Sequence, residues 1–353
     1  MVTNTSGLDP SDALDTKRPP TDLREVMRDL ICMEDQEAAL RRLVEKLMSF
    51  SSGDVDMIQI DQTQLRLLQA DGTHHQFRVH PQGMEIDLET GLLYITAVEI
   101  VEQRDAARRH CGKGRAHLFE CDIEGNTIRS INLKSDNEEE YHPSGVVLID
   151  GTMFIALAQY LPETSATIIK FNVKDWTYEK LFRIQDHVGL VVPNLVEGEL
   201  FLGTWGSRHY HRTDLKGNIK GKHQTPCFDE MEHQDAQLLS ASLGTLGNIN
   251  LDSTTPKRAD SRGTMMLATG VTAGESEYFG IDLIDVASWS IKTSLRWPSA
   301  QHLTKGGWAP FANPTYLWVD SYHRILALAT PDDCHEQTGK DATLMLYTLC
   351  PRE

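Results

Sequence analysis

The chain has 353 residues and the composition of an ordinary soluble protein, with 40% apolar and 24% charged residues. Its formal net charge of −17, from 34 basic and 51 acidic residues, would repel a nucleic-acid backbone and excludes nucleic acid as a partner. Without a membrane-length apolar run, a hydrophobic signal segment or a CxxC pair among its six scattered cysteines, the chain is expected to be cytoplasmic, with reduced thiols.

The first fifty residues divide into two parts. Residues 1–20 are polar and contain three prolines, which predicts a disordered tail. Residues 21–52 carry apolar side chains at helical spacing, in two stripes: Leu23, Val26, Met27, Leu30 and Ile31, then Leu40, Leu43, Val44 and Leu47. We expect two amphipathic helices or one bent helix. Their apolar faces could lie on the side or bottom of the following domain, cap it, or pair with a second chain as a homodimer.

From residue 53 to residue 353 the helical period gives way to a repeat. The stretch "HPQGMEIDLETGLLYIT" begins at His80 and "HPSGVVLIDGTMFIALAQY" begins at His142; related units begin at His187, His233 and near Gly306. The intervals are 62, 45, 46 and roughly 73 residues. Each unit is typical of four short antiparallel strands joined by tight turns, which is the pattern of a β-propeller blade.

We therefore predict an all-β fold: a single β-propeller of five four-stranded antiparallel blades, or six if the N-terminal segment adds more than one strand. Residues 64–80 are typical of the last two strands of a blade, and "DATLMLYTLC" at 341–350 of a third strand without a fourth. Joining these segments would close the ring with strands from both ends of the chain. Two stacked sheets would explain the strands but not the period. The polar stretch "STTPKRADSRG", at 253–263, is predicted to be an insertion at a strand connection.

The repeat places histidines at one mouth of the predicted channel. The residue before a blade's first strand lies on the same face as the end of the second strand, so His80, His142, His187 and His233 are expected there. They could donate hydrogen bonds, transfer protons or bind a divalent metal. Alternatively, each ring hydrogen-bonds the backbone of a neighbouring blade in a structural turn. If a metal is present, these four histidines are its predicted ligands.

Other side chains are expected around the same mouth. Trp205 and Trp308 stand beside glycines, which would let a large ring face a cavity, although propellers also pack tryptophans between blades. Glu99 and Asp332 also lie at the ends of second strands. The predicted substrate-binding residues are Gln82, Tyr141, Gln159, Tyr160, Trp205, Arg208, Asp235 and Trp308.

The units starting at His80, His142 and His187 resemble, over residues 75–350, a family of single-domain propellers in fungi and bacteria. Its fungal members include intermolecular hetero-Diels–Alderases (pericyclases) of tropolone–sesquiterpene meroterpenoid biosynthesis, a branch of secondary metabolism. The resemblance implies an enzyme that joins a quinone methide to a sesquiterpene olefin without an organic cofactor. The N-terminal helices are not part of the repeat that carries it.

Position in the predicted ring, rather than a matched motif, suggests the catalytic roles. His142, His187 and His233, with His80, would donate hydrogen bonds or transfer protons. Trp205 and Trp308 would stack on small apolar or aromatic substrates.

Two other functions stay open. The first is a metal-dependent hydrolase or lyase of the lactonase kind that uses the histidine ring, although the Glu/Asn/Asp set of calcium-dependent lactonases is missing from the blade starts. The second is a non-catalytic binding propeller, for which a histidine-lined mouth would be unexpected.

Overall fold

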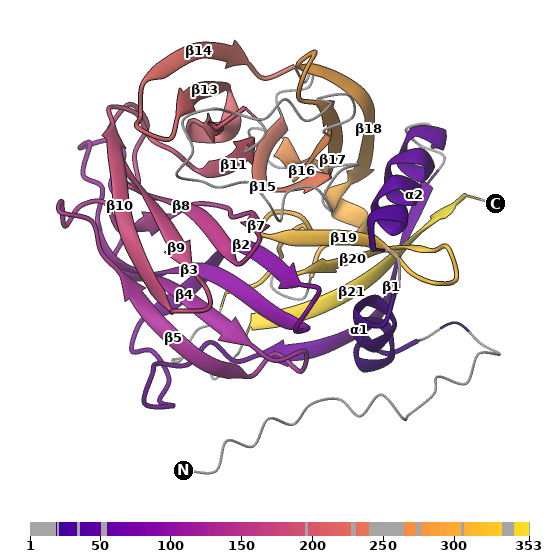
Figure 1. Ribbon diagram of the computed structural model, residues 1–353. Coiled ribbons are helices and arrows are strands. Elements are labelled where there is room, and N and C mark those ends of the chain that lie inside the picture. Colours follow the sequence, from indigo (N-terminus) through magenta and orange to yellow (C-terminus); the bar gives the residue numbers. More distant parts are fainter. Residues whose placement is uncertain are drawn as a thin grey trace.

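The computed structural model describes residues 19, 21–33, 36–50, 55–194, 197–226, 231–239, 265–272, 277–304, 307–333 and 342–352. The tail predicted for 1–20, apart from residue 19, and the insertion predicted at 253–263 lie outside the described residues. The rest forms five antiparallel sheets arranged as a ring, so the predicted five-bladed propeller is confirmed (Figure 1).

The blades follow the chain in order, and each begins with its innermost strand. Blade 1 consists of β2 (Arg78–Asp87), β3 (Leu92–Glu102), β4 (Lys113–Cys121) and β5 (Thr127–Leu133). In blade 2 the innermost strand has two pieces, β6 (His142–Pro143) and β7 (Leu148–Ile149), followed by β8 (Thr152–Ala158), β9 (Ala166–Asn172) and β10 (Thr177–Ile184).

The next two blades repeat this arrangement. Blade 3 consists of β11 (Leu190–Asn194), β12 (Glu199–Gly203), β13 (His209–Asp214) and β14 (Ile219–Gln224), with the short 3₁₀ helix η1 (Trp205–Ser207) between β12 and β13. Blade 4 consists of β15 (Met231–Leu239), β16 (Met265–Thr272), β17 (Tyr278–Asp285) and β18 (Ser290–Pro298), and η2 (Ser299–Gln301) follows it.

Blade 5 closes the ring with strands from both ends of the chain. It consists of β19 (Thr315–Val319), β20 (Ile325–Ala329), β21 (Ala342–Pro351) and, outermost, β1 (Val55–Leu65). β1 pairs antiparallel with β21 from Val55↔Pro351 to Leu65↔Ala342. The predicted closure is confirmed, but the two strands predicted within 64–80 are wrong. Three C-terminal strands leave one position in blade 5, and β1 fills it, so 66–77 is a connection with isolated bridges at Arg66 and Leu68.

A buried carboxylate lies where the innermost strands meet. The Asp235 carboxylate, in β15, accepts hydrogen bonds from the backbone N–H groups of Met84 and Ala236, both at 3.0 Å, and from those of Val146 and Thr315. These amides belong to blades 1, 4, 2 and 5, so one side chain joins four blades. Buried backbone amides need acceptors, and this carboxylate supplies one for each of them.

Neighbouring polar groups extend this central network. The side-chain amide of Gln237 donates to the carbonyl of Leu317 at 3.0 Å and accepts from its N–H at 2.7 Å, which joins β15 to β19. Burial, together with the nearby Asp235, raises the pKa of Glu85 well above its usual range. Burial also raises the pKa of Asp235 well above its usual range, and the four backbone N–H donors oppose that rise.

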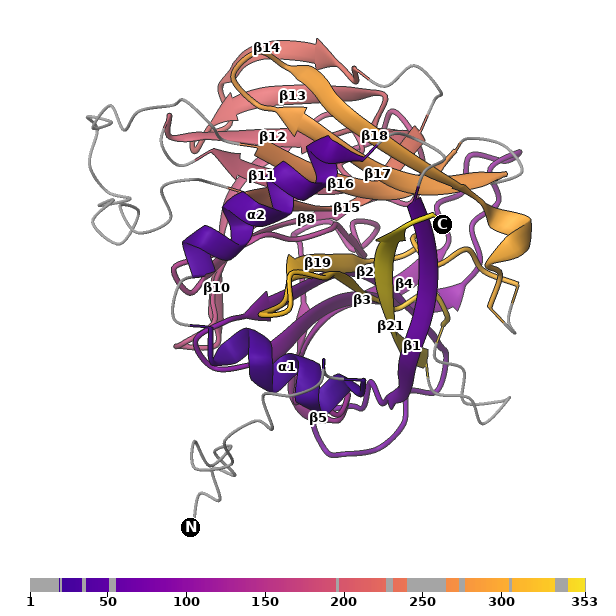
Figure 2. The same ribbon diagram turned by 90° about the vertical axis from the view of Figure 1, so that its right-hand side faces the viewer.

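The two predicted helices are α1 (Leu23–Ile31) and α2 (Gln36–Ser49). α1 begins at the N-cap Asp22, whose side chain accepts from the N–H of Glu25 at 2.9 Å. The Leu23 N–H donates to Asp61 of β1 at 2.6 Å. In Figures 1 and 2 the helices lie beside β19, β21 and β1.

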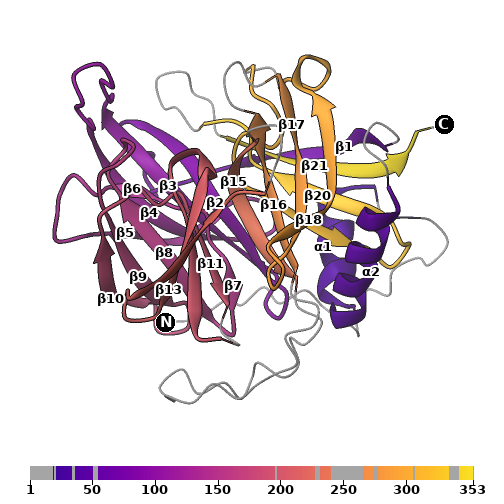
Figure 3. The ribbon, with the colours of Figure 1, turned by 90° about the horizontal axis from the view of Figure 1, so that it is seen from above.

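Both helices pack against the face of the propeller opposite the histidines. Asp29 of α1 accepts from the backbone and hydroxyl of Ser321, in the turn after β19, at 2.9 and 2.6 Å. The apolar side of α2 packs with Leu239 and Val319, at the far ends of β15 and β19. Seen from above, the helices lie beside blades 4 and 5 (Figure 3).

The sequence allowed the helices to lie on the side or bottom of the propeller, to cap it, or to pair with a second chain. In the structure they lie on the bottom, the face opposite the histidines. Their apolar side chains Leu23, Val26, Met27, Leu30, Leu40, Leu43 and Leu47 are buried against the same chain. A second chain is therefore not needed to cover them. No described helix is both long and apolar enough to cross a membrane.

The Asp235 network predicts a large effect on stability. Replacing Asp235 by Asn puts an NH₂ group where backbone N–H donors point, so the free energy of unfolding should fall by about 3 kcal/mol. Urea unfolding followed by circular dichroism would measure this. Asp136→Asn, at a side chain that is 90% exposed, is the matched control and should change stability by less than about 0.5 kcal/mol. Equal effects of the two substitutions would contradict the central role of Asp235.

Candidate functional site

Two of the four predicted histidines meet at the channel mouth. His142 opens β6, and His187 lies just before β11. Their ring centroids are 6.1 Å apart. His80, in β2, is near enough to influence the charge of His142, and its own ring lies 6.3 Å from that of Trp308. The repeat therefore brings the histidines of blades 2 and 3 together, with His80 of blade 1 nearby.

Three further side chains complete what we term the mouth cluster: His142, His187, Tyr160, Trp205 and Arg104. His142 stacks on Tyr160 with centroids 4.2 Å apart and an interplanar angle of 15°. His187 meets Trp205 edge to face at 4.7 Å. The Arg104 guanidinium lies over both rings, 4.3 Å from Tyr160 and 4.8 Å from Trp205, within the range of cation–π attraction.

Local sequence explains how these groups converge. Arg104, Tyr160 and Trp205 are each the second residue after the second strand of blades 1, 2 and 3. Equivalent positions on neighbouring blades point to one mouth, so the rings meet. Trp205 is also held by its turn. Gly206 has a φ of +60° and Ser207 a φ of +49°, and the Ser207 hydroxyl donates to the carbonyl of His233 at 2.8 Å.

The two cluster histidines are neutral at pH 7. Burial, followed by the neighbouring charges of His187, His80 and Arg104, lowers the pKa of His142 well below its usual range. Burial lowers the pKa of His187 to about 4. His187 Nδ1 donates to the carbonyl of Gln159 at 2.7 Å, so its Nε2 carries a lone pair. Neutral imidazoles can both donate and accept hydrogen bonds without adding charge.

His142 differs from its neighbours because neither ring nitrogen has a partner. Its side chain is 5% exposed, and both Nδ1 and Nε2 are buried without a hydrogen bond. An unsatisfied buried polar group costs about 1–3 kcal/mol and usually indicates a functional role or a bound molecule. This is the clearest sign of a ligand site in the part of the chain that the structure describes.

His80 lies at the rim beside the mouth cluster. Its Nδ1 donates to the Asp333 carboxylate, which also forms an ion pair with Arg78 at 3.3 Å. The carboxylate fixes the tautomer, and His80 Nε2 is left as an acceptor. Trp308 beside it is 38% exposed, so a large ring reaches solvent at the rim.

The expectation that His233 lines the mouth is wrong. Its side chain is fully buried between blades 3 and 4. Tyr210 donates to its Nδ1 at 2.8 Å, and its Nε2 donates to Asp282 at 3.0 Å. Both nitrogens are satisfied by side chains of third strands, so the structural alternative applies to this histidine. Both β2 and β15 contain a bulge, between Pro81 and Gly83 and between His233 and Asp235, so His233 corresponds to Pro81 rather than to His80. A shift of one residue turns a strand side chain to the other face.

The predicted substrate-binding residues divide in the same way. Tyr160 and Trp205 are in the mouth cluster and Trp308 is at the rim, whereas Asp235 is the buried carboxylate of the central network. Tyr141 is buried and its hydroxyl donates to the carbonyl of Cys111. The side chains of the remaining three have other surroundings. Gln82 donates to the Pro81 carbonyl, Gln159 donates to the Ser165 hydroxyl, and Arg208 is exposed.

Sequence reasoning missed Arg104. The positional rule that selects Tyr160 and Trp205 selects Glu99 in blade 1. Because β3 continues to Glu102, the residue equivalent to Tyr160 and Trp205 is Arg104.

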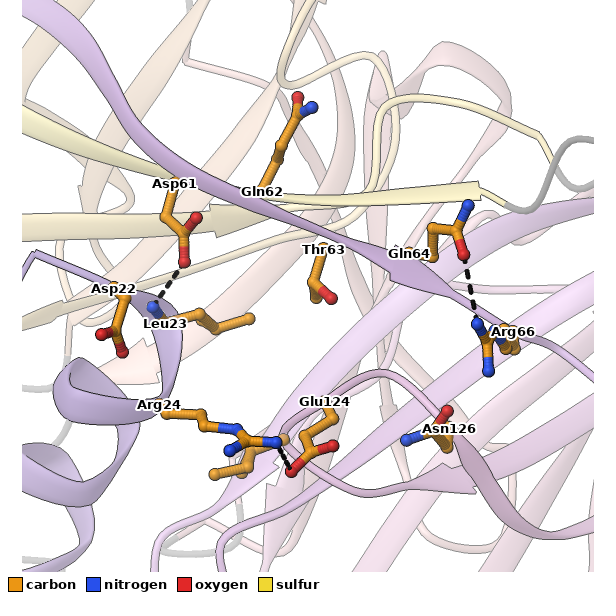
Figure 4. Close-up of a pocket in the computed structure, with 11 residues that line it drawn as sticks. Asp22, Leu23, Arg24, Asp61, Gln62, Thr63, Gln64, Arg66, Glu124 and Asn126 are labelled. Atoms are coloured by element: carbon orange, nitrogen blue, oxygen red, sulfur yellow. Dashed lines mark hydrogen bonds and ion pairs between the residues drawn. The ribbon is translucent and has the colours of Figure 1, made fainter.

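A groove at the outer edge of the ring is not part of the mouth (Figure 4). It has a volume of about 410 Å³ and lies between the start of α1, β1 and the turn after β4. Its polar side chains bind one another: Asp61 accepts from the N–H of Leu23, Arg24 pairs with Glu124, and Arg66 donates to Gln64. These mutual contacts leave little reason to expect a ligand there.

The depressed pKa of His187 predicts a loss of stability in acid. An imidazole in the unfolded chain titrates near 6.5, whereas His187 in the folded chain titrates near 4. The unfolded state therefore binds more protons between these values, and stability falls as pH decreases from about 6.5 to about 4. From pH 7 to pH 5 the contribution of His187 is about 2 kcal/mol.

Urea unfolding at both pH values would test this. His187→Gln should reduce the pH-dependent loss by that amount, while His110→Gln, on the exposed 103–112 loop, should keep the wild-type loss. An unchanged loss in His187→Gln would show that the buried ring is not the titrating group.

Comparison with solved structures finds similar chain traces at low sequence identity. A glutaminyl cyclase from Myxococcus xanthus has a TM-score of 0.44 at 10% identity, covering 83% of this chain and 97% of that one. A family 117 glycoside hydrolase from Zobellia galactanivorans has a TM-score of 0.45 at 9% identity, covering 86% and 91%. A GH43 β-xylosidase/α-arabinofuranosidase from a compost metagenome has a TM-score of 0.44 at 9% identity, covering 82% and 94%. Scores below 0.5 carry no conclusion about activity.

No curated protein matches the sequence. A protein family described as "Family of unknown function (DUF6454)" matches residues 50–231. The matched segment makes up more than half of the 353 residues and contains blades 1–3 with every residue of the mouth cluster. The chain belongs to the DUF6454 family.

Proposed function

We propose that the mouth cluster is the active site of an enzyme that binds a planar conjugated carbonyl compound. The reaction that we propose is the intermolecular hetero-Diels–Alder cycloaddition of a tropolone-type quinone methide with a sesquiterpene olefin. The observation that carries the proposal is His142, a buried neutral imidazole with two unpartnered nitrogens in contact with an aromatic ring.

The hydrogen-bonding capacity of His142 suits a carbonyl oxygen. One ring N–H can donate to that oxygen, which removes the cost of an unsatisfied buried donor and polarises the conjugated system. Arg104 places a positive charge nearby, with its guanidinium 4.3 Å from the Tyr160 ring. As the olefin attacks the methide carbon, negative charge moves to the oxygen, and a preorganised donor and cation stabilise it.

The aromatic groups suit the olefin. Positive charge develops on an olefin carbon while the first carbon–carbon bond forms, and the faces of Tyr160 and Trp205 attract positive charge. Their centroids lie 5.7 Å apart. The second bond joins that carbon to the carbonyl oxygen, so no group leaves and no redox partner is required. Holding the two substrates together can supply about 7 kcal/mol or more of the rate enhancement.

The same histidines could generate the quinone methide. In a hydroxymethyl tropolone, His187 Nε2, whose lone pair is free of the Gln159 contact, would accept the proton of the tropolone hydroxyl. The imidazolium so formed would pass that proton to the departing hydroxyl, which leaves as water, while His142 hydrogen-bonds the carbonyl oxygen. His187 ends the step in the neutral form in which it began.

A second candidate is a metal-dependent hydrolase or lyase. It is favoured by two hydrogen bonds: His80 Nδ1 donates to the Asp333 carboxylate, and His187 Nδ1 donates to the Gln159 carbonyl. Such contacts are common behind metal-binding imidazoles and leave both Nε2 atoms available. Loss of bound metal in a His80→Ala/His187→Ala variant would support this candidate over the cofactor-free cycloaddition.

Activity of a His142→Phe variant would test the proposal. Phenylalanine keeps the stacking on Tyr160 but removes both nitrogens, so kcat should fall by about 10²–10³ with little change in KM. The assay would follow adduct formation from a hydroxymethyl tropolone and humulene, against the uncatalysed reaction. His223→Phe is the control, since the His223 ring lies 5.0 Å from that of Trp289, at an interplanar angle of 39°, in a contact outside the mouth cluster, and should retain wild-type rates. Wild-type rates in His142→Phe, or no acceleration by the wild-type protein, would contradict the proposal.

A further inference from the structure

A second group of histidines lies on the other face of blade 1. His75 in the 66–77 connection, Glu99 in β3 and His117 in β4 have exposed fractions of 4%, 2% and 7%. One potential ligand atom from each lies within 4.8 Å of the others. Glu99 was expected at the channel mouth, and this position corrects that expectation. We term these three residues the buried triad.

The sheet of blade 1 separates the buried triad from the mouth cluster. Ala97 lies two residues from Glu99 in β3, and Phe119 lies two residues from His117 in β4, so each points to the same face as its neighbour. Both pack in the core shared with blade 5. Val98 and Ile100, on the opposite face of β3, pack with Tyr141 and Tyr160 on the side of the mouth. Successive side chains of a strand point to opposite faces, so the two groups are separate.

The distances within the triad are unusual for hydrogen bonds. Glu99 Oε2 is 3.4 Å from His117 Nε2 and 3.5 Å from His75 Nδ1, whereas N–H···O hydrogen bonds cluster at about 2.7–3.2 Å. Ligands of a tetrahedral ion with bonds of about 2.0–2.1 Å lie about 3.3–3.4 Å from one another. The two distances from Glu99 are therefore close to those between ligands of one ion, and all three ligand atoms lie within 4.8 Å of one another.

The donor set also suits a metal. A carboxylate and neutral imidazoles are the forms that bind metals, and all three side chains are buried.

We propose that His75, Glu99 and His117 form a binding site for a divalent transition-metal ion, for which zinc has the best-matched bond lengths. Two nitrogens and one oxygen leave a fourth position for water. Arg115 Nη1 donates to Glu99 Oε2 at 3.0 Å, while its side chain is 52% exposed, so it orients the carboxylate from the solvent side. Because the ligands come from a connection and two strands, the ion would fix residues 66–77 to blade 1.

Metal content of the untagged full-length protein, purified without chelator, is the first test. About one equivalent of metal per chain is expected in the wild type, and Glu99→Gln and His117→Gln should lose it. His142→Ala and His187→Ala, in the mouth cluster, should retain it. Loss in the mouth variants with retention in the triad variants would overturn the proposal and support the metal-dependent candidate for the mouth instead.

A cobalt-binding experiment tests the proposal even if a variant folds poorly or the protein loses its metal during purification. Chelator-treated wild-type protein given Co²⁺ should develop the visible bands of a tetrahedral ion and a higher melting temperature, and Arg115→Gln should do the same. Glu99→Gln should show neither change. If the wild-type protein holds no metal and cobalt gives neither bands nor a shift in melting temperature, the triad is a buried ion-pair network and the proposal fails. None of these readouts depends on the activity proposed for the mouth.

Discussion

The carboxylate of Asp235 is the constraint on which the geometry of the ring depends. A propeller brings its innermost strands together around an axis, where backbone amides lose contact with water and need acceptors. Asp235 satisfies amides of blades 1, 2, 4 and 5 at once. Blade 3 is joined to its neighbours by the Gly145 N–H, which donates to the Gly189 carbonyl at 3.0 Å, and by Ser207. These bonds fix the starts of the innermost strands relative to one another, and the mouth is built from those starts.

Close packing at the axis also explains why glycines lie within the innermost strands of blades 1 and 2. A Cβ on Gly145 would lie 2.8 Å from Asp235 Oδ1, and a Cβ on Gly83 would lie 2.8 Å from the backbone of Gly145. The "HPxG" sequence of blades 1 and 2 therefore serves two needs: its glycine lets the backbones approach the carboxylate, and its histidine stands at the mouth. A short motif that looks like a functional signature is in part a requirement of the fold.

The repeat period was enough to predict five blades and a ring closed from both ends, because four strands per unit leave few other arrangements. It could not separate His142 from His233. Both stand at the start of a blade, but Tyr210 and Asp282 satisfy His233, and these partners come from third strands 23 and 49 residues away. The buried triad escaped prediction for a similar reason. His75, Glu99 and His117 follow no ligand spacing, and pairing of β3 with β4 and folding of the 66–77 connection are needed to bring them together.

The two histidine groups are linked by the chain even though a sheet separates them. The 66–77 connection that supplies His75 leads directly into β2, where Arg78 and His80 meet Asp333 of blade 5. Whatever fixes His75 against Glu99 and His117 also fixes the start of β2, since only two residues lie between His75 and Arg78. An ion in the triad would therefore act on the mouth through position, because it would hold the His80–Asp333 pair at the rim.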